Sequence, residues 1–455
     1  MCIRDRSMDQ ILAIDIGTQS LRAGILDGQL NILERQQVPL TVRVSRGTHA
    51  EMDGEEIWFA LVAACKGLDL RNRVAAVVLS TLCPSLLPID AAGRPLHPVI
   101  LHLDRRSEKE ARWALHTIGE ETFLNIAGNL PIPGGISLTS LLWLKNNAPE
   151  IYRREDVCFG HVATLILRRL TGKFLIDPSN ASFTGLYDTV GYADWDERLY
   201  GPLDIDPDKL PTVAHSNSVA GEILPGVAAD LGIPEAIPVV TGANDTTCAC
   251  VGAGVNTEGD LLNTSGTVDI LVLCLEKPLT SRRHLLRTHA YPGKWLAMRT
   301  VGAGGGSLEW FRKNFCREFD KEDFYSSYVK HVLDNPPPLR SSFRPFLSGN
   351  RHQVEMATAS FENLTLDSTR EEMLVALLDG IVSFQFEELD VWKDHVDLNK
   401  CIKHVGGGAT SRYTAFKQEK LPDFKLMMVG ETTLAGAARL ALETLEKHRR
   451  ASSKT

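Results

Sequence analysis

Asp245 stands where an apolar segment of the sequence gives way to a run of small residues. The stretch TGANDTTCAC, residues 241–250, begins within the apolar run IPVVTG and continues into a run with helical character. A carboxylate at such a junction can cap the helix by accepting backbone N–H bonds. It can also act as a general base that takes a proton from a substrate. One oxygen can cap while the other faces a substrate, so the sequence leaves both roles open.

Four glycine-rich turns are suited to bind phosphate. Three follow apolar strands, at residues 17–20, 264–267 and 406–409, and a fourth, at 302–306, opens a helix. Backbone N–H groups in such turns bind anions, and glycine allows a close approach. One such turn is commonly structural, whereas four together with a candidate base indicate a phosphate site. The chain has neither a Walker A motif nor a strand-linked G-x-G-x-x-G, so other loops would hold a nucleotide.

The elements that must position these residues alternate between strands and helices. QILAIDI and LRAGILD predict a hairpin whose tip is GTQS, residues 17–20. GDLLNTSGTVDILVL repeats this pattern from residue 259, which suggests two related halves. The spacing of apolar residues predicts helices over residues 55–68, 368–392 and 429–450. This alternation predicts the α/β class.

The composition is typical of a soluble globular protein with two or three domains. The chain has 455 residues, of which 44% are hydrophobic and 23% charged, and its net charge is −8. The acidic balance argues against nucleic acid as a partner, and no apolar run reaches about 18 residues, which argues against a membrane span. Nine dispersed cysteines fit a reducing, cytoplasmic location. MCIRDRS, residues 1–7, is interpreted as a non-native extension before Met8.

The ordered set of motifs resembles the FGGY carbohydrate kinases of the sugar-kinase/actin superfamily. AIDIGTQSLRAGILD is similar to the first phosphate motif of that family, NTSGTV to the second, and VGGGATSRYTAFKQ to the adenosine motif. TGANDTTCACVGAG resembles the segment that carries the catalytic base, and GETTLAGAARLA resembles the closing helix. The similarity is collinear from about Met8 to Leu445, nearly the whole chain.

The resemblance implies two related ribonuclease-H-like lobes of the actin-like ATPase fold, with an ATP and sugar cleft between them. It places the N-terminal lobe at residues 8–246, with the catalytic Asp at its end, and the C-terminal lobe at residues 247–455. The family also suggests a homodimer.

The resemblance further implies that a sugar hydroxyl attacks the γ-phosphate of ATP, with Asp245 as the general base and Mg²⁺ near Asp15. The alternative for Asp15 is a turn-forming role, and Arg22 either pairs locally or faces phosphate. Asn263 replaces the usual glycine before the second motif, and Asn tolerates a left-handed turn. The residues implied to bind the nucleotide and its metal are Asp15, Gly17, Thr18, Gln19, Ser20, Thr264, Ser265, Gly266, Gly305, Gly306, Gly407, Gly408 and Ala409.

The sugar side of the sequence departs most from the family. In the segment STLCPS, residues 82–84 are Leu, Cys and Pro, where relatives often carry polar residues. Substrate recognition therefore falls to Asn244, Asp104 and Arg106. The alternative for Asp104 and Arg106 is a structural ion pair, and Cys83 is interpreted as a buried, unreactive thiol.

The predicted function is ATP-dependent phosphorylation of a small-molecule sugar or polyol, such as a xylulose- or ribulose-like ketose, with ATP and Mg²⁺ as cofactors. The alternative is a catalytically inactive sugar- or nucleotide-binding regulator of the same fold. The altered STLCPS segment and Asn263 motivate that alternative. The presence of both Asp15 and Asp245 favours the enzyme, because a binding module would not require them.

Overall fold

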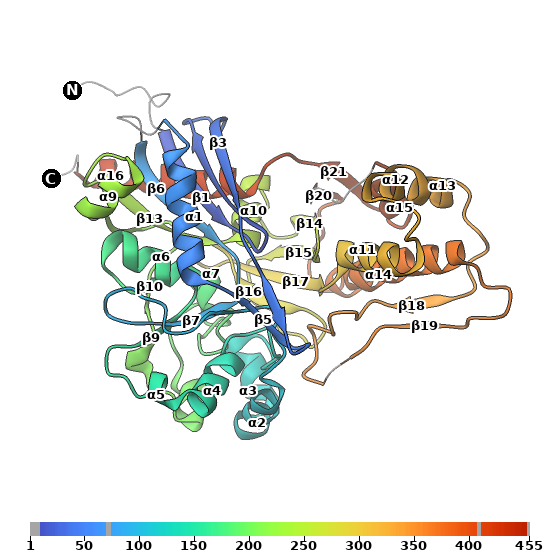
Figure 1. Ribbon diagram of the computed structural model, residues 1–455, viewed down its shortest axis with the longest axis horizontal. Coiled ribbons are helices and arrows are strands. Elements are labelled where there is room, and N and C mark those ends of the chain that lie inside the picture. The colour runs from blue at the N-terminus through green and yellow to red at the C-terminus, as the bar shows by residue number, and fades with distance from the viewer. Residues whose placement is uncertain (1–9, 70–73, 356, 407–410, 453–455) are drawn as a thin grey trace. The chain divides into compact units, whose positions relative to one another are not determined.

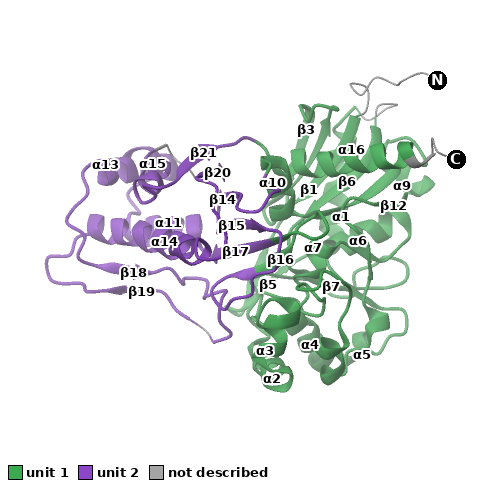
Figure 2. Ribbon diagram, turned by 180° about the vertical axis from the view of Figure 1, so that it is seen from behind, with its two compact units in different colours: residues 1–254, 286–295, 431–455 green, residues 255–285, 296–430 purple. Residues whose placement is uncertain are grey.

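The chain folds into two compact units in the computed structural model, which describes residues 10–69, 74–355, 357–406 and 411–452 (Figure 1). Unit 1 comprises residues 1–254, 286–295 and 431–455, and unit 2 comprises residues 255–285 and 296–430 (Figure 2). Helices and strands occur together in both units, which confirms the predicted α/β class. These units differ from the predicted division after residue 246, because the C-terminal helix belongs to unit 1 and not to the second part of the chain.

The first part of unit 1 is rich in strands. Its elements are β1 (Gln10–Ile16), β2 (Ser20–Leu26), β3 (Ile32–Pro39), β4 (Arg43–Ser45), β5 (His49–Met52), α1 (Gly54–Lys66), β6 (Val74–Thr81), β7 (Ser85–Ile89), β8 (Val99–Leu101) and α2 (Glu108–Ile118).

The rest of unit 1 is mostly helical. Its elements are α3 (Glu120–Thr122), η2 (Phe123–Ala127), α4 (Leu138–Asn147), α5 (Pro149–Tyr152), β9 (Cys158–Gly160), α6 (Val162–Thr171), β10 (Leu175–Ile176), α7 (Pro178–Ala181), α8 (Glu197–Tyr200), η3 (Gly201–Leu203), η4 (Pro207–Lys209), β11 (Thr212–Val213), β12 (Val219–Glu222), α9 (Pro225–Leu231), β13 (Pro238–Asn244), α10 (Asp245–Ala253) and α16 (Thr433–Ser452).

The central sheet of unit 1 has six strands in the order β12-β13-β6-β1-β2-β3. β1, β6 and β13 run parallel to one another, and β2 is antiparallel to β1. Side chains alternate between the two faces of β1. Ile11 and Ala13 share a core with α16, whereas Leu12 and Ile14 share a core with α1 and α6. Burial on both faces explains why these strands are apolar almost throughout.

The parallel register brings the carboxyl ends of three strands to one edge of this sheet. Asp15 of β1 is in register with Ser80 of β6, and Asn244 of β13 is in register with Thr81. In open α/β sheets, ligands bind outside the carboxyl ends of the parallel strands. The candidate site residues of unit 1 therefore gather at this edge.

Gly242 interrupts β13 just before that edge. The register between β13 and β6 shifts here, and Gly242 has a φ of +78°. A Cβ at this position would lie 1.9 Å from the carbonyl oxygen of Leu79. The bulge therefore requires glycine, and it sets the direction in which Asn244 and Asp245 leave the strand.

Two glycines allow α10 and α16 to pack closely. A Cβ on Gly252 would lie 1.9 Å from the carbonyl oxygen of Thr432, and a Cβ on Gly436 would lie 1.8 Å from that of Cys248. Small residues permit this approach of the two backbones. The contact fixes the N-terminal end of α16 beside the helix that begins at Asp245.

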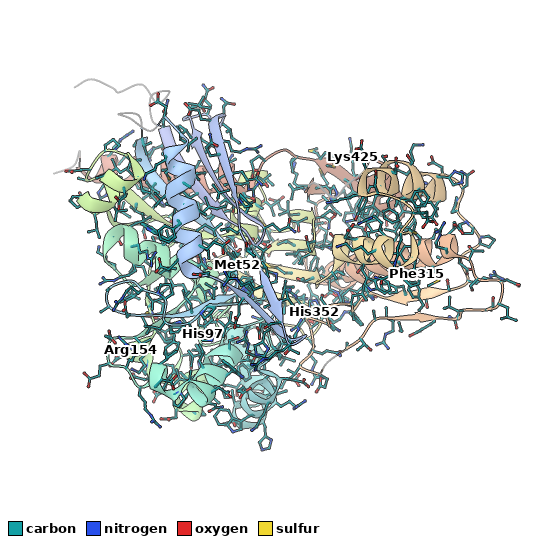
Figure 3. All side chains as sticks on the ribbon, in the orientation of Figure 1. Met52, His97, Arg154, Phe315, His352 and Lys425 are labelled. Atoms are coloured by element: carbon teal, nitrogen blue, oxygen red, sulfur yellow. The ribbon has the colours of Figure 1, made fainter. Side chains whose placement is uncertain are left out.

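A second sheet of unit 1 has five strands in the order β4-β5-β8-β7-β9. Met52, at the end of β5 and labelled in Figure 3, is buried in the same core as α1 and the inner face of β6. The two sheets of unit 1 therefore share one hydrophobic core.

The elements between residues 255 and 430 belong to unit 2, except for β16, most of which lies in unit 1. The elements are β14 (Leu261–Ser265), β15 (Asp269–Leu275), β16 (Leu285–Thr288), β17 (Trp295–Val301), α11 (Gly304–Phe315), α12 (Lys321–Asp323), η5 (Phe324–Tyr328), α13 (Val329–Asp334), β18 (Ser342–Arg344), β19 (Ser360–Glu362), α14 (Arg370–Trp392), β20 (Cys401–Val405), α15 (Ser411–Glu419) and β21 (Lys425–Met428).

The sheet of unit 2 contains β17, β15, β14, β20 and β21 in that order. β14 and β15 form an antiparallel hairpin, and β20 runs parallel to β14. This arrangement repeats that of β1, β2 and β6 in unit 1. The two hairpins that look alike in the sequence therefore occupy equivalent positions in their sheets.

The longest helices are α14, with 23 residues, and α16, with 20. Glu372 and Glu388 interrupt the apolar residues of α14. Within the described ranges, none of the helices is long and apolar enough to cross a membrane.

We expect Gly436→Ala to lower the free energy of unfolding by about 1–3 kcal/mol, because the added methyl group would force α10 and α16 apart. Urea denaturation measures this loss. Gly226→Ala on α9 is the matched control, since a Cβ there would meet nothing within 4 Å. An equal effect of the two substitutions would show that the close helix contact is unimportant.

Candidate active site

Asp15 lies at the carboxyl end of β1 and is 2% exposed. Its Oδ1 accepts a hydrogen bond of 2.8 Å from Ser80 Oγ. Its Oδ2 accepts a bond of 3.0 Å from Arg22 Nε and a second bond from Nη2 of the same guanidinium. Arg22 is the cross-strand neighbour of Asp15 in the β1–β2 hairpin. Of the two interpretations of Arg22, the structure shows the local ion pair.

Arg22 also binds a second carboxylate. Its Nη1 donates to Glu431 Oε2 at 2.6 Å. Glu431 Oε1 accepts bonds of 2.9 and 3.3 Å from the backbone N–H groups of Thr433 and Leu434, at the start of α16. A helix N-terminus stabilises negative charge. Arg22 therefore connects Asp15 to the N-terminal end of α16.

Asp245 is the first residue of α10, and its surroundings separate its two oxygens. Oδ1 accepts bonds of 2.7 Å from the backbone N–H of Thr246 and 3.3 Å from the Thr246 hydroxyl. No described residue donates a hydrogen bond to Oδ2. Asn244, not Asp245, is the N-cap, because its side chain accepts a bond of 2.9 Å from the backbone N–H of Thr247. The hypothesis that Asp245 caps the helix is therefore wrong.

The electrostatic setting makes Asp245 an unusual carboxylate. Burial and the nearby charge of Asp15 raise the pKa of Asp245 to about 7, although the Thr246 bonds and the Arg22 charge act in the opposite direction. Burial also raises the pKa of Asp15, while Arg22 and Ser80 lower it. A carboxylate with a pKa near 7 can both accept and return a proton at neutral pH. We call Asp15, Arg22, Ser80, Asp245 and Glu431 the carboxylate cluster.

Asn244 is fully buried beside this cluster. Its Oδ1 is used by the helix cap, and its backbone N–H donates to Ser179 Oγ at 2.9 Å. Its Nδ2 has no hydrogen-bond partner among the described residues. The observed role of Asn244 is to begin α10, and its predicted contact with a substrate stays a prediction.

The first phosphate-type turn follows Asp15 directly. Gly17 N–H donates to the carbonyl oxygen of Ser20 at 3.0 Å, which closes a tight turn between β1 and β2. Thr18 and Ser20 are partly exposed, and Gln19 is exposed. The turn thus presents its polar groups at the carboxyl end of β1. Its binding of phosphate stays a prediction.

Asp104 and Arg106 form a buried ion pair. Arg106 Nε and Nη2 donate to the Asp104 oxygens at 2.9 and 2.7 Å, and Ala50 N–H donates to Asp104 Oδ2 at 2.7 Å. Arg106 Nη2 also donates to Glu51 at 2.6 Å, and its guanidinium lies 4.9 Å from the Trp143 ring centre. These contacts match the structural alternative, and a role in substrate binding stays a prediction.

The STLCPS segment places Cys83 beside a histidine. Cys83 Sγ lies 3.4 Å from His161 Nδ1 and 3.9 Å from the carbonyl oxygen of Asn180. Burial raises the pKa of the Cys83 thiol well above its usual range. Burial also lowers the pKa of His161 to about 4. At neutral pH the thiol is protonated and the imidazole is neutral, which agrees with an unreactive Cys83.

In unit 2 the turn between β14 and β15 rests on a buried lysine. Lys417 Nζ donates to Asp269 Oδ2 at 3.0 Å, to Asn263 Oδ1 at 3.3 Å and to Ser265 Oγ. Asp269 Oδ1 accepts a bond of 3.2 Å from the backbone N–H of Gly266. We call Asn263, Ser265, Asp269 and Lys417 the turn network. It fixes the shape of the second phosphate-type turn from inside the unit.

This network changes the expectation for Asn263. The residue lies inside β14, opposite Leu271, and its side chain donates to Gln385 at 3.0 Å. The left-handed turn expected at Asn263 is therefore wrong, because the position is extended strand that any residue can adopt. Gly266 N–H is engaged by Asp269, which leaves partly exposed Thr264 as a predicted phosphate contact.

The glycine run at residues 304–306 packs against the same turn. Gly305 N–H donates to the carbonyl oxygen of Gly266 at 2.9 Å, and Gly306 N–H donates to that of Thr267 at 3.3 Å. A Cβ on Gly305 would lie 2.5 Å from the Gly266 oxygen. Two predicted nucleotide segments of unit 2 are thus brought together, and their nucleotide contacts stay predictions. The remaining predicted residues, Gly407, Gly408 and Ala409, lie outside the described residues.

Sequence reasoning did not assign four of the residues that support these sites: Ser80, Glu431, Asp269 and Lys417. A polar residue that closes the apolar run VAAVVLST was the available signal for Ser80. The available signal for Glu431 was an acidic residue just before the segment TTLAGAARLA, where a negative charge favours a helix start. Its partner Arg22 lies 409 residues away in the sequence, and Lys417 lies 148 residues from Asp269.

Comparison with known proteins identifies a family. The FGGY family of carbohydrate kinases, N-terminal domain, matches residues 10–252. The xylulose kinase of Escherichia coli is 27% identical over 443 residues, which cover 94% of this chain and 89% of that enzyme. The gluconokinase of Bacillus subtilis is 26% identical over 387 residues, which cover 82% and 74% of the two chains.

Solved structures share the fold. The xylulose kinase from Lactobacillus acidophilus superposes with a TM-score of 0.86 at 20% identity, covering 96% of this chain and 90% of that one. The Plasmodium falciparum glycerol kinase with ADP superposes with a TM-score of 0.83 at 23% identity, covering 97% and 90%. The expected sugar-kinase fold is therefore confirmed.

We expect Asp245→Asn to stabilise the protein more at about pH 8 than at about pH 5. The pKa of Asp245 is about 7 in the folded protein, against an ordinary value of 3.8. The folded state thus binds the extra proton between these values, and wild-type stability falls as pH rises through this window. Melting temperatures of both proteins across pH measure the difference, which should grow from about pH 4 to 7 and then stay constant.

Asp90→Asn is the control of opposite sign. Burial raises the pKa of Asp90, but hydrogen bonds from the backbone N–H and the side chain of Arg94 help to lower it overall. Its carboxylate therefore stabilises the fold above about pH 4, and this contribution is lost as pH falls. A pH-independent difference for Asp245→Asn would contradict the raised pKa.

We expect Lys417→Met to lower the free energy of unfolding by about 3–5 kcal/mol, because it leaves the Asp269 carboxylate buried without its cation. The double variant Lys417→Met/Asp269→Asn should recover part of this loss. Urea denaturation of the single and double variants measures the coupling. Strictly additive losses would show that the two residues do not act as a pair.

Proposed function

Because the chain belongs to the FGGY family of carbohydrate kinases, we propose that it transfers the γ-phosphate of ATP to a hydroxyl of a sugar or polyol, with Asp245 as the general base. The observation that carries this proposal is the state of Asp245. It stands at the carboxyl end of β13, its pKa is about 7, and its Oδ2 accepts no hydrogen bond from a described residue.

The proposed step balances as an in-line displacement. The acceptor hydroxyl gives its proton to Asp245 Oδ2, and its oxygen forms a bond to the γ-phosphorus. The bond between the γ-phosphorus and the oxygen that bridges it to the β-phosphate breaks, and ADP leaves. Asp245 Oδ1 remains bonded to Thr246, so the carboxylate keeps its orientation during the transfer.

Acceptor chemistry is supported by the relatives. A xylulose kinase and a gluconokinase are among the similar proteins. Both named substrates are acyclic or open-chain polyhydroxylated molecules of five or six carbons. We assign the same broad class of acceptor to this chain. Asn244, Asp104 and Arg106 are the predicted sugar-side residues, and Asn244 is the one whose backbone adjoins the proposed base.

Asp15 is the residue proposed to hold Mg²⁺. Its Oδ2 is engaged by Arg22, but Oδ1 accepts one bond, from Ser80, and a carboxylate oxygen has a second lone pair. In the described part of the chain, no group of three or more potential ligands is arranged for a metal. A single carboxylate, that of Asp15, fits an Mg²⁺ ion that keeps its waters and is bound mainly by phosphate oxygens. Such an ion would neutralise charge on the transferred phosphate.

Phosphate contacts are proposed for each unit by itself. In unit 1 they are Gly17, Thr18, Gln19 and Ser20, which follow Asp15. In unit 2 Thr264 is the proposed contact, because the N–H groups of Gly266, Gly305 and Gly306 and the Ser265 hydroxyl are already bonded within the unit. The turn network supports this assignment, because it holds the second turn in one conformation before a ligand binds.

We expect Asp245→Asn to lower kcat by about 10²–10⁴-fold, because the acceptor proton loses its base. ADP release is measured with ATP, Mg²⁺ and a panel of ketoses, alditols and aldonates. Nucleotide affinity, measured by calorimetry, should remain close to that of the wild type. Asp230→Asn, an exposed change on α9, is the control.

Three outcomes of this experiment separate the candidate functions. Saturable, acceptor-dependent ADP release in the wild type supports the kinase. Ligand binding without turnover would replace it with the regulator of the same fold. Full activity of Asp245→Asn would remove Asp245 from the role of base.

A further inference from the structure

Arg287 on β16 is a fully buried cation that unit 1 surrounds with neutral groups. Its Nη1 donates to the carbonyl oxygens of Leu286 and Ser182 at 3.1 and 3.3 Å, and its Nη2 donates to that of Gly135 at 3.2 Å. The Phe183 ring centre lies 3.9 Å from the guanidinium carbon. No described carboxylate forms an ion pair with this guanidinium.

Two other buried cations among the described residues have carboxylate partners. Arg106 pairs with Asp104 at 2.7 Å, and Lys417 pairs with Asp269 at 3.0 Å. A buried charge is costly unless an opposite charge compensates it. Burial lowers the pKa of Arg287 to about 9, so the group is still cationic at neutral pH. Arg287 is therefore a buried charge for which no described residue supplies a carboxylate counter-ion.

One side of the guanidinium is incompletely used. The group has five N–H donors, and the three bonds engage Nη1 twice and Nη2 once. Nε has no hydrogen-bond partner among the described residues. Nε and Nη2 form the side that binds a carboxylate through two parallel bonds. The geometry thus leaves a carboxylate-binding edge on a buried cation.

The short segment around α7 connects this edge with the proposed base. Ser179 Oγ accepts a bond of 2.9 Å from the backbone N–H of Asn244, next to Asp245. Ser182, three residues later, accepts the bond from Arg287. The segment from Ser179 to Ser182 therefore contacts both the residue that precedes the proposed base and the Arg287 guanidinium.

The charges of Arg287, Asp177 and Asp245 all act on the Cys83 thiol, whose Sγ lies 3.9 Å from the Asn180 carbonyl oxygen on α7. Cys83 is partly exposed, whereas Arg287 is covered. Binding of an acid would require the Phe183 ring to move from the guanidinium that it covers. Leu82, Cys83 and Pro84 carry no charged side chain, so Arg287 would supply the charge that recognises the acid.

We propose that Arg287 determines specificity for a polyhydroxy acid, whose carboxylate binds the Nε and Nη2 edge while one of its hydroxyls is phosphorylated at Asp245. A carboxylate fits better than a phosphate, since a single cation and one flat edge match a planar group of charge −1. This inference rests on the proposed kinase function, because it names the acceptor class of that reaction.

The first test measures binding to the wild-type protein. Calorimetry compares aldonates of four to six carbons with the alditols of the same stereochemistry, for example gluconate with glucitol. At least one aldonate should bind about 100-fold more tightly than its alditol, because the alditol leaves the Arg287 edge unpaired. Binding of alditols or ketoses with no preference for any acid would overturn the proposal.

The second test separates recognition from a structural role. Arg287→Met should lower aldonate affinity about 100-fold and leave ATP affinity unchanged. The melting temperature of this variant without ligand should be equal to or above that of the wild type, because an uncompensated buried charge is removed. Aldonates should raise the melting temperature of the wild type and not of the variant. A large fall in the variant's ligand-free melting temperature would show that Arg287 is structural.

Arg299→Met is the matched control for this measurement. Arg299 is also buried and lies over an aromatic ring, 3.7 Å from the Phe384 centre, but it pairs with Glu387 at 2.6 Å. This substitution should lower the melting temperature and leave aldonate binding intact. Arg287→Lys should retain part of the affinity, since it keeps the charge but loses the two-donor edge.

The outcomes also separate this inference from the proposed kinase function. ATP-dependent phosphorylation of aldonates would support both. Tight aldonate binding without ADP release would remove the kinase proposal and keep Arg287 as an acid-binding residue. Phosphorylation of neutral ketoses with no response to aldonates would keep the kinase and overturn the role of Arg287.

Discussion

The proposed catalytic edge of unit 1 depends on one interaction, the binding of two carboxylates by Arg22. β1, β6 and β13 end at the same edge, which brings the buried Asp15 close to the partly exposed Asp245. Two uncompensated carboxylates would repel each other there. Arg22 compensates Asp15 and Glu431 through direct bonds, whereas Asp245 is bonded only to Thr246 among the described residues. The same arrangement therefore holds one carboxylate in an ion pair and leaves the other, Asp245, with a pKa of about 7.

Unit 2 also compensates a buried carboxylate, Asp269, but it does so with a lysine. Its hairpin repeats the pattern of the first, but the cation comes from a helix rather than from the neighbouring strand. Lys417 binds Asp269 from inside the unit, and Asp269 in turn binds the Gly266 backbone. The glycine run that begins α11 then packs on the turn, where a side chain on Gly305 would clash. The turn is shaped by buried contacts and not by its own sequence alone, which explains how it tolerates Asn263.

The features that could be predicted from the sequence are those with local causes. The hairpin that pairs Asp15 with Arg22 spans a few residues, and the position of Asp245 follows from the end of an apolar strand. The pairing of Arg22 with Glu431 could not be predicted, because it joins opposite ends of the chain. Asp245, the candidate N-cap in the sequence, lies one residue after the observed N-cap, since the strand runs through Asn244 before α10 begins. For Asp104 and Arg106 the sequence left two roles open, and burial of both side chains, which sequence does not reveal, describes the ion pair.

Buried charged groups of the protein fall into two kinds: those paired with an opposite charge, and those to which we assign contacts with a ligand. Asp104 with Arg106, and Asp269 with Lys417, are closed pairs whose hydrogen bonds are satisfied within their own unit. Asp245 and Arg287 differ, because among the described residues Asp245 Oδ2 accepts no hydrogen bond and Arg287 Nε donates none. A fold that can pair its buried charges elsewhere has no stability reason to leave these two incomplete. A substrate that offers a hydroxyl to one and a carboxylate to the other would complete both, and its binding would stabilise the protein by satisfying groups that are costly without it.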